Sequence, residues 1–580
     1  MNVSLASPLQ WLGRIRAAVV RRPALWVGLL FCTMLLIGIL ALGMRSPGLD
    51  YEPEMRILES NIKVYVELFT GTDSPLYQSF DIEGDIRTSI ERDHGESALY
   101  PLWVLLRLAK HCFGASGLHC ELLSFFYFHL LFLLALYALY RIVWQLTASR
   151  GWGIVGMLLL YLNPRFFAES FYNNKDLVLL SLCLIVFWTG LGFLHRTNWI
   201  SCVFFGAAGA FAFNTRLLGI AAFGVCGLVY LADLTIRRRW SRRMFLRGAL
   251  AVASFLLVYY IITPACWSHP VEFFRYVYTN TTGFDISRWN NTILYRGDWF
   301  NPASRPLPWH YIPWLICITT PLPILALAVL WLLKPVFPLY RSLSERLDQN
   351  TLYEIGLLFF AAVPLLASMI GGANLYNGWR HLYFVYGAIV ALAACSAAWL
   401  WKLHKRWLRP LLTAVLCANL LYYGGFIAVN YPHEYAYFNF LAGEHPEESY
   451  DADYWMISLR PVLLELLERD TFCSVTDIGP VPRCRYQWYH MSDYPIEIQE
   501  REEEVTWDRR NRAVYVVENT SYWKLERLQN TWAADGIHDA MQEWIRVVRE
   551  SEVVYEAKCG RTVLWRVYKN PQYNGSPVEW

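Results

Sequence analysis

The feature that most constrains this chain is a succession of long apolar segments separated by polar loops. A helix needs about 20 apolar residues to cross a hydrocarbon core of about 30 Å. Eleven segments approach or meet that length: 26–44, 122–144, 152–162, 177–194, 199–213, 217–231, 249–262, 313–333, 352–370, 382–401 and 411–429. The segments that begin at Trp152 and Trp199 are short, and either is also compatible with a re-entrant segment. The sequence therefore predicts a polytopic α-helical membrane protein with about eleven transmembrane helices.

Composition and charge agree with a membrane environment. Apolar residues make up 55% of the 580 residues and charged residues only 17%, a mixture that would leave a soluble protein with too much apolar surface in water. The net charge of +3 gives no reason to expect a nucleic acid or another polyanion as a partner. Membrane lipids are the expected surroundings of the chain.

Basic residues predict how the chain is oriented. Three stretches are rich in arginine and lysine: residues 14–22, the loop 237–247 (RRRWSRRMFLR) and the loop 401–409 (WKLHKRWLR). With eleven spans all three lie on one side, and basic loops are held on the cytoplasmic side. We therefore expect a multi-pass protein of a bacterial plasma membrane, with a cytoplasmic N-terminus and outward loops at 45–121 and 263–311. The first apolar run lacks a cleavage site and reads as a retained helix.

The composition changes abruptly after residue 429, which predicts two parts. Residues 1–429 form the membrane module, and residues 430–580 form an outward-facing soluble domain of α/β or α+β type, with strands at AVYVVEN and RTVLWRVY and helices at ISLRPVLLELLERD and GIHDAMQEWIRVVRE. In the first outward loop, residues 52–69 and 98–114 read as helices lying at the membrane interface. The second outward loop is expected to pack against the first. The outward cysteines, Cys112 with Cys120 and Cys473 with Cys484, fit local disulfides or free thiols.

Four groups of ionisable residues lie at the outward ends of spans, where charge is costly to keep. They are LDYEPE with Asp50, Glu52 and Glu54; NPRFFAESFYNNKD with Arg165, Glu169, Lys175 and Asp176; FNTRLLG with Arg216; and NLYNGWRHLYF with Arg380 and His381. Their common side and depth predict one cavity that contains acids and cations together. In such a cavity a carboxylate can take a proton from an acceptor hydroxyl, and the cations can hold a phosphate leaving group.

A structural role is the simpler interpretation for some of these residues. Acids and bases near span ends often pair with one another or extend towards the interface. We favour that interpretation for Glu54, Glu59 and Glu169, and for the histidines His269 and His433. No metal-ligand spacing such as HExxH occurs, so no metal site is predicted.

The motifs together resemble those of GT-C glycosyltransferases of the protein-O-mannosyltransferase and aminoarabinose-transferase type. The matching features are LDYEPE directly after the first span, the NPRFFAESFYNNKD turn, the stretch YRGDWFNPASRPLPWHYIPWLICITTPLP, the GWRHLYF segment, and NYPHEYAYFNFLAG followed by DADYWMIS. They span most of the chain from residue 49 to residue 458. Their order and their common side of the membrane make the resemblance more specific than any single motif.

The resemblance implies an inverting transferase that takes a sugar from a polyprenyl monophosphate donor at the outer face. It implies a general base in the first outward loop, which here is Asp50 or Glu52, and a second acid at Asp176, with Lys175 beside it. The phosphate-binding residues that the resemblance implies are Lys175 and Arg380, together with Arg216 and His381. Guanidinium and ammonium groups can neutralise a monophosphate, so no metal cofactor is expected. The acceptor is a glycan, a lipid or a protein.

Two other classes of function remain open from the sequence. A polytopic transporter or lipid flippase would also combine many spans with embedded charges, although transporters usually show paired repeats and interrupted helices. An outward scaffold that binds a partner through the C-terminal domain would leave the acid and cation cavity unexplained. The transferase is the interpretation that accounts for most of the motifs.

Overall fold

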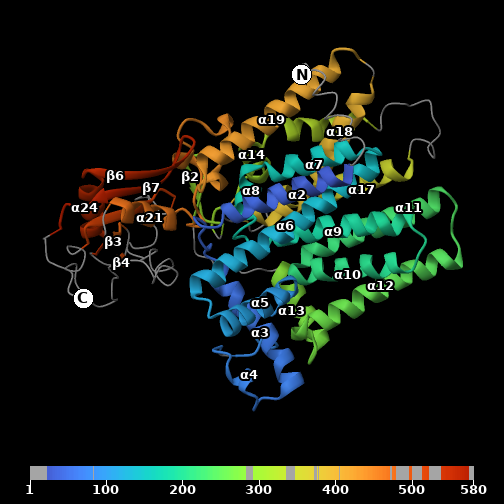
Figure 1. The fold of residues 1–580 in the computed structure, drawn as a ribbon, viewed down its shortest axis with the longest axis horizontal. Coiled ribbons are helices and arrows are strands. Elements are labelled where there is room, and N and C mark those ends of the chain that lie inside the picture. Colours follow the sequence, from blue (N-terminus) through green and yellow to red (C-terminus); the bar gives the residue numbers. More distant parts are fainter. Residues whose placement is uncertain are drawn as a thin grey trace, which may run out of the picture.

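The computed structural model describes residues 23–573, apart from residues 83, 283–291, 303, 335–346, 371–374, 376–377, 404, 470–472, 479–495, 499–512 and 522–536. A helix bundle forms its larger part, and a small sheet lies at one end of the bundle (Figure 1). The basic stretch 14–22 and Cys484 lie outside the described residues.

Helices occupy all eleven of the expected segments. They are α2 (Pro23–Leu40), α6 (Gly117–Thr147), α7 (Arg150–Tyr161), α9 (Asp176–His195), α10 (Ile200–Thr215), α11 (Ile220–Ile236), α12 (Arg242–Ile262), α14 (Tyr311–Thr319) with α15 (Leu322–Leu330), α17 (Gln349–Ile370), α18 (Tyr386–Lys402) and α19 (Leu408–Asn430). Within the described residues seven spans are long and apolar enough to cross a membrane, and an eighth is added if α14 and α15 count as one. The others, α2, α7 and α10, are shorter. The fold is that of a multi-pass helical membrane protein.

The eighth span is bent, which the sequence did not indicate. Its two halves, α14 and α15, meet at an angle of 119°. Pro321 follows the last helical turn of α14, and a proline restricts the residue before it to extended conformations and lacks an amide proton for the helix. The carbonyls freed at the break are bonded by Asn439, whose Nδ2 donates to the carbonyls of Cys317 (2.6 Å) and Thr320 (3.2 Å).

The loops between spans carry helices of their own. These are α3 (Tyr51–Thr70), α4 (Pro75–Gln78), α5 (Tyr100–Phe113), α8 (Pro164–Glu169) and α13 (Pro270–Thr282), and a hairpin of β1 (Ile293–Tyr295) and β2 (Asp298–Phe300). The helices α3 and α5 confirm the two expected in the first outward loop. The second loop packs against the first, as expected, because Asn280 Nδ2 donates to Asp93 Oδ2 at 2.7 Å. Cys112 and Cys120 are free thiols.

The C-terminal part contains a five-stranded mixed sheet. Its strands are β3 (Cys473–Asp477), β4 (Ile496–Ile498), β5 (Tyr515–Asn519), β6 (Val553–Cys559) and β7 (Thr562–Lys569), and its helices include α20 (Pro446–Ser449), α21 (Leu459–Arg469) and α24 (Ile537–Arg549). The order is β4-β3-β5-β7-β6, parallel from β4 to β5 and antiparallel from β5 to β6. The expected strands and helices are confirmed, while the division at residue 429 stays a prediction.

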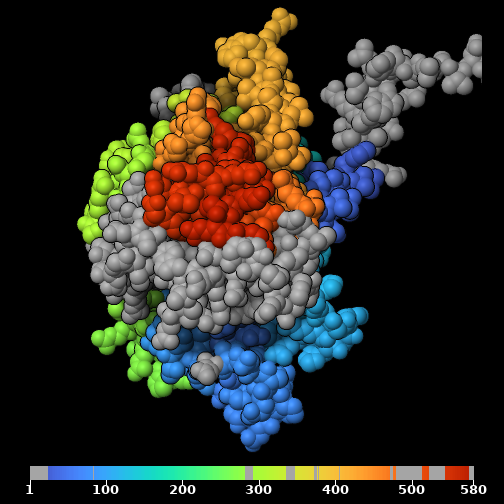
Figure 2. Space-filling view, turned by 90° about the vertical axis from the view of Figure 1, so that its left-hand side faces the viewer, coloured from blue at the N-terminus to red at the C-terminus, as the bar shows by residue number. Residues whose placement is uncertain are grey.

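One end of the molecule therefore gathers the sheet, the loop helices and the outward motifs. Figure 1 shows the sheet and the helices α3 to α5 at this end, and the turn between α11 and α12, which carries the basic loop, at the other. Figure 2 looks at this end, where the C-terminal strands (red) lie beside the end of α19 (orange) and above the first loop (blue).

Candidate functional site

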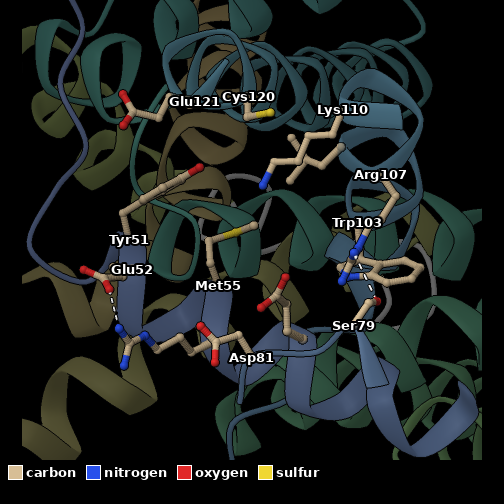
Figure 3. Close-up of a pocket in the computed structure, with 14 residues that line it drawn as sticks. Tyr51, Glu52, Met55, Ser79, Asp81, Trp103, Arg107, Lys110, Cys120 and Glu121 are labelled. Carbon is tan, nitrogen blue, oxygen red and sulfur yellow. Dashed lines mark hydrogen bonds and ion pairs between the residues drawn. The ribbon is translucent and has the colours of Figure 1, made fainter. Parts of the chain in front are cut away.

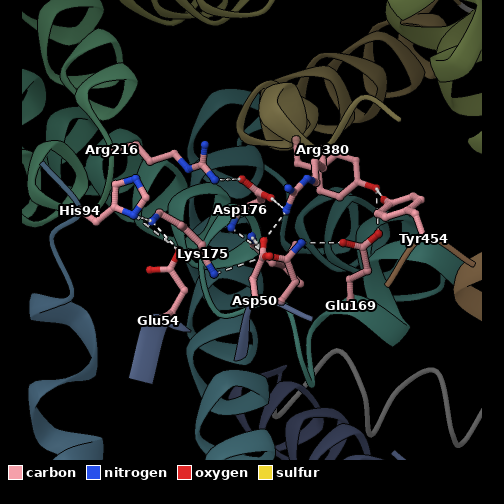
Figure 4. A network of polar contacts seen from close by, with 12 residues as sticks. Asp50, Glu54, His94, Glu169, Lys175, Asp176, Arg216, Arg380 and Tyr454 are labelled. Carbon is pink, nitrogen blue, oxygen red and sulfur yellow. Dashed lines mark hydrogen bonds and ion pairs between the residues drawn. The ribbon is translucent and has the colours of Figure 1, made fainter. Parts of the chain in front are cut away.

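Four of the predicted residues form an alternating chain of acids and cations (Figure 4). Arg380 Nη1 lies 2.7 Å from Asp50 Oδ2 and 3.7 Å from Asp176 Oδ2. Arg216 Nη2 lies 2.8 Å from Asp176 Oδ1. The four residues come from the start of α3, the start of α9, the end of α10 and the 3₁₀ turn before α18. The structure thus brings together residues that are separated by up to 330 positions. We call these four residues the open cluster.

Burial differs sharply along the open cluster. The side chain of Asp176 is only 2% exposed and that of Arg380 6%, whereas Arg216 is 24% and Asp50 42% exposed. The middle of the cluster is therefore fixed among protein atoms, and its two ends face space that a ligand can reach. Asp50 is therefore the acid of the cluster that a ligand can contact, and Arg380 holds its carboxylate in place.

The hydrogen bonds of the turn before α9 fix the position of Asp176. Asn173 Oδ1 accepts the backbone amide of Asp176 at 2.8 Å, so the first turn of α9 is capped. A carboxylate in the first turn of a helix is also favoured by the helix dipole. Upstream, Asn163 caps α8, and Pro164 at its first position has no amide proton to satisfy. The asparagines and the proline of this motif therefore shape the turn, and Asp176 is the group it delivers.

Glu169 lies behind the open cluster and is fully enclosed. Its carboxylate accepts the Tyr383 hydroxyl at 2.8 Å and Asn173 Nδ2 at 2.6 Å, and Arg165 Nη1 is 3.8 Å away. Burial raises the pKa of Glu169 to about 7, although Arg165 and the two hydrogen bonds act in the opposite direction. The side chain has no open approach, which agrees with a supporting role.

Lys175, at the start of α9, contacts two residues of the first outward loop. Its Nζ lies 2.6 Å from Glu54 Oε1 and 2.7 Å from His94 Nδ1. Burial opposes ionisation of Glu54, but Lys175 and His94 outweigh it and hold the pKa of Glu54 below its usual range. Burial and the Lys175 charge lower the pKa of His94 to about 4. Lys175 thus holds the first outward loop to the turn before α9.

Glu52 and Asp50 point to different places. Glu52 Oε1 pairs with Arg56 at 2.7 Å on the exposed side of α3. Glu52 also lines a pocket of about 430 Å³ between α3, α5 and the start of α6 (Figure 3). The other lining residues are Tyr51, Met55, Arg56, Glu59, Ser79, Asp81, Trp103, Leu106, Arg107, Lys110, Gly117, Cys120 and Glu121. Lys110, Glu59 and Asp81 form no ion pair with any residue that the structure describes.

Two residues near the site were not singled out from the sequence. The guanidinium of Arg380 lies over the ring of Trp455, 4.6 Å from its centroid. Trp455 belongs to the DADYWMIS motif, so its position in the motif was the available signal. His94, which contacts Lys175, lies in a polar loop that carried no such signal. His381 follows Arg380 in the 3₁₀ turn and is half-buried.

Among the described residues, no group of three or more histidine, cysteine, aspartate or glutamate side chains is arranged to hold a metal ion. The helices and the open cluster together define a polytopic membrane protein with an ionisable site at one end of its bundle. No protein-family model matches the chain, and no curated protein matches it by sequence.

Solved structures do match over nearly the whole chain. ArnT from Cupriavidus metallidurans bound to undecaprenyl phosphate aligns with 95% of this chain and 99% of its own, at 13% identity and a TM-score of 0.43. The same protein in the apo state aligns with 96% and 100%, at 14% identity and a TM-score of 0.43. ArnT is a GT-C aminoarabinose transferase, the type that the sequence motifs resemble.

Proposed function

We propose that this chain is a membrane glycosyltransferase that moves a sugar from a polyprenyl monophosphate to an acceptor hydroxyl at the outer face of the membrane. The observation that carries the proposal is the open cluster. Its exposed carboxylate, Asp50, lies 2.7 Å from Arg380, and buried Asp176 lies between Arg380 and Arg216. A base and two phosphate-binding cations are then held at one place. The transfer of a sugar between two oxygen atoms needs these groups.

The reaction follows from this arrangement. The Asp50 carboxylate takes the proton of the acceptor hydroxyl as the hydroxyl oxygen forms a bond to the anomeric carbon. The bond from that carbon to the phosphate oxygen breaks, and its electron pair leaves with the polyprenyl phosphate. Arg380 and Arg216 stabilise the negative charge that develops on the leaving phosphate. One displacement inverts the anomeric carbon, and no metal is needed because two guanidinium groups face one monophosphate.

Asp50 is the better candidate for the base because it contacts Arg380, whereas Glu52 pairs with exposed Arg56. His381, adjacent to Arg380, completes the set of proposed donor residues, while Lys175 acts through the loop.

We propose the orientation of the chain in the membrane from the positions of its basic residues. The basic loop between α11 and α12 lies at the end of the bundle opposite the open cluster. Basic loops stay in the cytoplasm, so the N-terminus is cytoplasmic and the sheet and the open cluster face outward in the plasma membrane. In a variant that carries Cys112→Ser, which removes the exposed thiol of the outward loop, we expect a thiol reagent added outside intact cells to label Ser74→Cys and not Ser241→Cys.

One observation favours a transporter as the second candidate. The broken span formed by α14 and α15 is a feature that transporters use at their binding sites. Here, however, the break is filled by protein: Asn439 bonds the freed carbonyls, and Trp379 Nε1 donates to Thr319 Oγ1 at 2.8 Å. This packing fits a fixed bend better than an ion or substrate site.

The test is turnover of a defined donor. Undecaprenyl phosphate is the lipid bound in one of the ArnT structures, so undecaprenyl-phosphate sugars are the first donors to supply, together with a membrane extract as acceptor. Release of undecaprenyl phosphate is measured for the wild type, Asp50→Asn and the control Glu52→Gln. We expect Asp50→Asn to lower turnover about 10²–10⁴-fold and Glu52→Gln to retain it. Movement of donor across vesicles without sugar transfer would instead support transport.

A further inference from the structure

The segment 451–458, DADYWMIS, connects the C-terminal sheet to the open cluster. It begins after α20 and leads into α21, which packs beside the sheet. One of its side chains, Asp453, is completely buried. Asp453 Oδ2 accepts the Trp565 indole N–H at 2.7 Å and the backbone amide of Ser458 at 3.2 Å. Since Trp565 lies in β7, this carboxylate ties the segment to the sheet.

The backbone of the segment is held by the sheet as well. The amides of Ala452 and Asp453 donate to Ser521 Oγ at 2.8 Å and 3.2 Å, and Asn519 Nδ2 donates to the carbonyl of Asp453 at 3.2 Å. Asn519 is the last residue of β5. Two neighbouring strands, β5 and β7, therefore fix the segment on both sides of Asp453.

Two residues further along, Trp455 reaches the open cluster from this fixed point. Its ring is 4.6 Å from the Arg380 guanidinium and only 4% of the residue is exposed. The same ring packs closely on Gly48, where an added Cβ would lie 3.0 Å from Trp455 Cε3. Gly48 is two residues before Asp50. One buried ring thus contacts Arg380 and also the backbone that leads to Asp50.

We propose that the C-terminal sheet positions Arg380 for the donor phosphate through Trp455. This inference rests on the proposed function. An arginine side chain has many rotamers, and a flat aromatic face under the guanidinium restricts them without using its N–H groups. The sheet fixes the ring through Asp453 and β5, so the ring does not have to be ordered when the donor binds. Trp455 is a positioning residue: it acts on the phosphate through Arg380.

The test measures binding of undecaprenyl phosphate to the full chain in lipid nanodiscs, so it needs no acceptor. We expect Trp455→Leu to weaken binding about fivefold, because it removes the cation–π contact. Trp455→Phe keeps an aromatic face and should bind within about twofold of the wild type. Trp314→Leu is the matched control, because Arg296 lies over the Trp314 ring at 5.4 Å, outside the open cluster. This control should bind normally.

Coupling to the sheet is tested by Trp565→Phe, which keeps the ring and removes the donor to Asp453. We expect it to weaken binding about threefold and to add nothing further in combination with Trp455→Leu, because both changes act on the same contact. Fully additive losses, or normal binding by Trp455→Leu, would overturn the inference. Normal binding by Arg380→Ala would instead refute the donor site itself, so failure of the proposed function is recognised separately.

Discussion

Two clusters of acids and arginines lie at the same end of this molecule, and they differ in how completely they are enclosed. The open cluster ends in Asp50, whose side chain is 42% exposed. The second, which we call the sealed cluster, joins Arg45 to Glu434 and Arg460 to Glu121, and its most exposed side chain is only 4% exposed. Arg460 Nη1 donates to the carbonyl of Arg45 at 2.9 Å, which connects the two pairs.

The sealed cluster has the features of a structural joint. The guanidinium of Arg45 is also stacked near Phe171, 4.6 Å from its ring centroid, and its Nη1 donates to the carbonyl of Pro432 at 3.2 Å. It links the end of α2 to the segment after α19, and Arg460 brings in α21. Charges of this kind hold elements together, and Glu121 is the member of the sealed cluster that also lines the pocket between α3, α5 and α6. The comparison teaches that the same residue types serve packing or chemistry according to whether one of them stays accessible.

The largest expected effect is on stability and belongs to the sealed cluster. Arg45→Met leaves Glu434 buried without its cation, which should lower the free energy of unfolding by about 3–5 kcal/mol. Thermal unfolding of the purified protein measures it. The double variant Arg45→Met with Glu434→Leu removes both charges and should recover most of the loss. If Arg45→Met is as stable as the wild type, the sealed cluster has no structural role that distinguishes it from the open cluster.

Next in size is a change at the open cluster that should affect activity more than stability. Arg216→Gln removes one proposed phosphate contact, while Arg380 stays close to Asp176. We expect KM for the donor to rise about 10–100-fold. The free energy of unfolding should fall by less than for Arg45→Met, because Arg380 remains 3.7 Å from buried Asp176. Steady-state kinetics and thermal unfolding of the same preparation measure both. A large loss of stability with unchanged KM would make this arginine a structural one.

The pH dependence of stability tests the enclosed carboxyl group behind the open cluster. Because burial raises the pKa of Glu169 from 4.5 to about 7, the folded protein keeps its proton over a range in which the unfolded chain loses it. Glu169 should therefore contribute stability below pH 4.5 that is lost as the pH rises to about 7, by about 1–3 kcal/mol. The difference in unfolding temperature between wild type and Glu169→Gln, followed from pH 4.5 to pH 8, measures it. A difference that does not vary with pH would contradict the raised pKa.

The smallest effect is expected where an ion pair is exposed. Glu52→Gln removes the pair with Arg56 on the surface of α3, and such pairs contribute about 0–1 kcal/mol. The free energy of unfolding should change by less than about 0.5 kcal/mol, and turnover should stay within about twofold of the wild type. A loss of turnover as large as that of Asp50→Asn would transfer the role of base to Glu52.

The sequence allowed most of the fold to be predicted. Every expected apolar segment contains a helix, the two loop helices are present, and the strands β5 and β7 fall where alternating residues indicated them. The bend between α14 and α15 was missed because a continuous apolar run does not show how a Thr-Pro step will turn within it. The sequence also predicted that Asp50, Asp176, Arg216 and Arg380 would meet, since all four lie at the same ends of spans.

Other features of the site needed the tertiary structure. Successive residues of a helix are turned by about 100°, so Asp50 and Glu52 face nearly opposite directions, and which of them meets Arg380 depends on how α3 is rotated. In the same way only packing decided that Lys175 reaches Glu54 and His94, and that Trp455 lies on Arg380.

The sequence by itself determined that the chain forms membrane helices and at which end its charges gather. In lipid each backbone amide and carbonyl must be bonded within its own segment, so long apolar runs have no alternative to the helix. The tertiary structure decided which carboxylate stays open and which is sealed. That choice depends on contacts between residues far apart in the chain, such as Arg45 with Glu434 and Arg380 with Asp50, which no local pattern encodes.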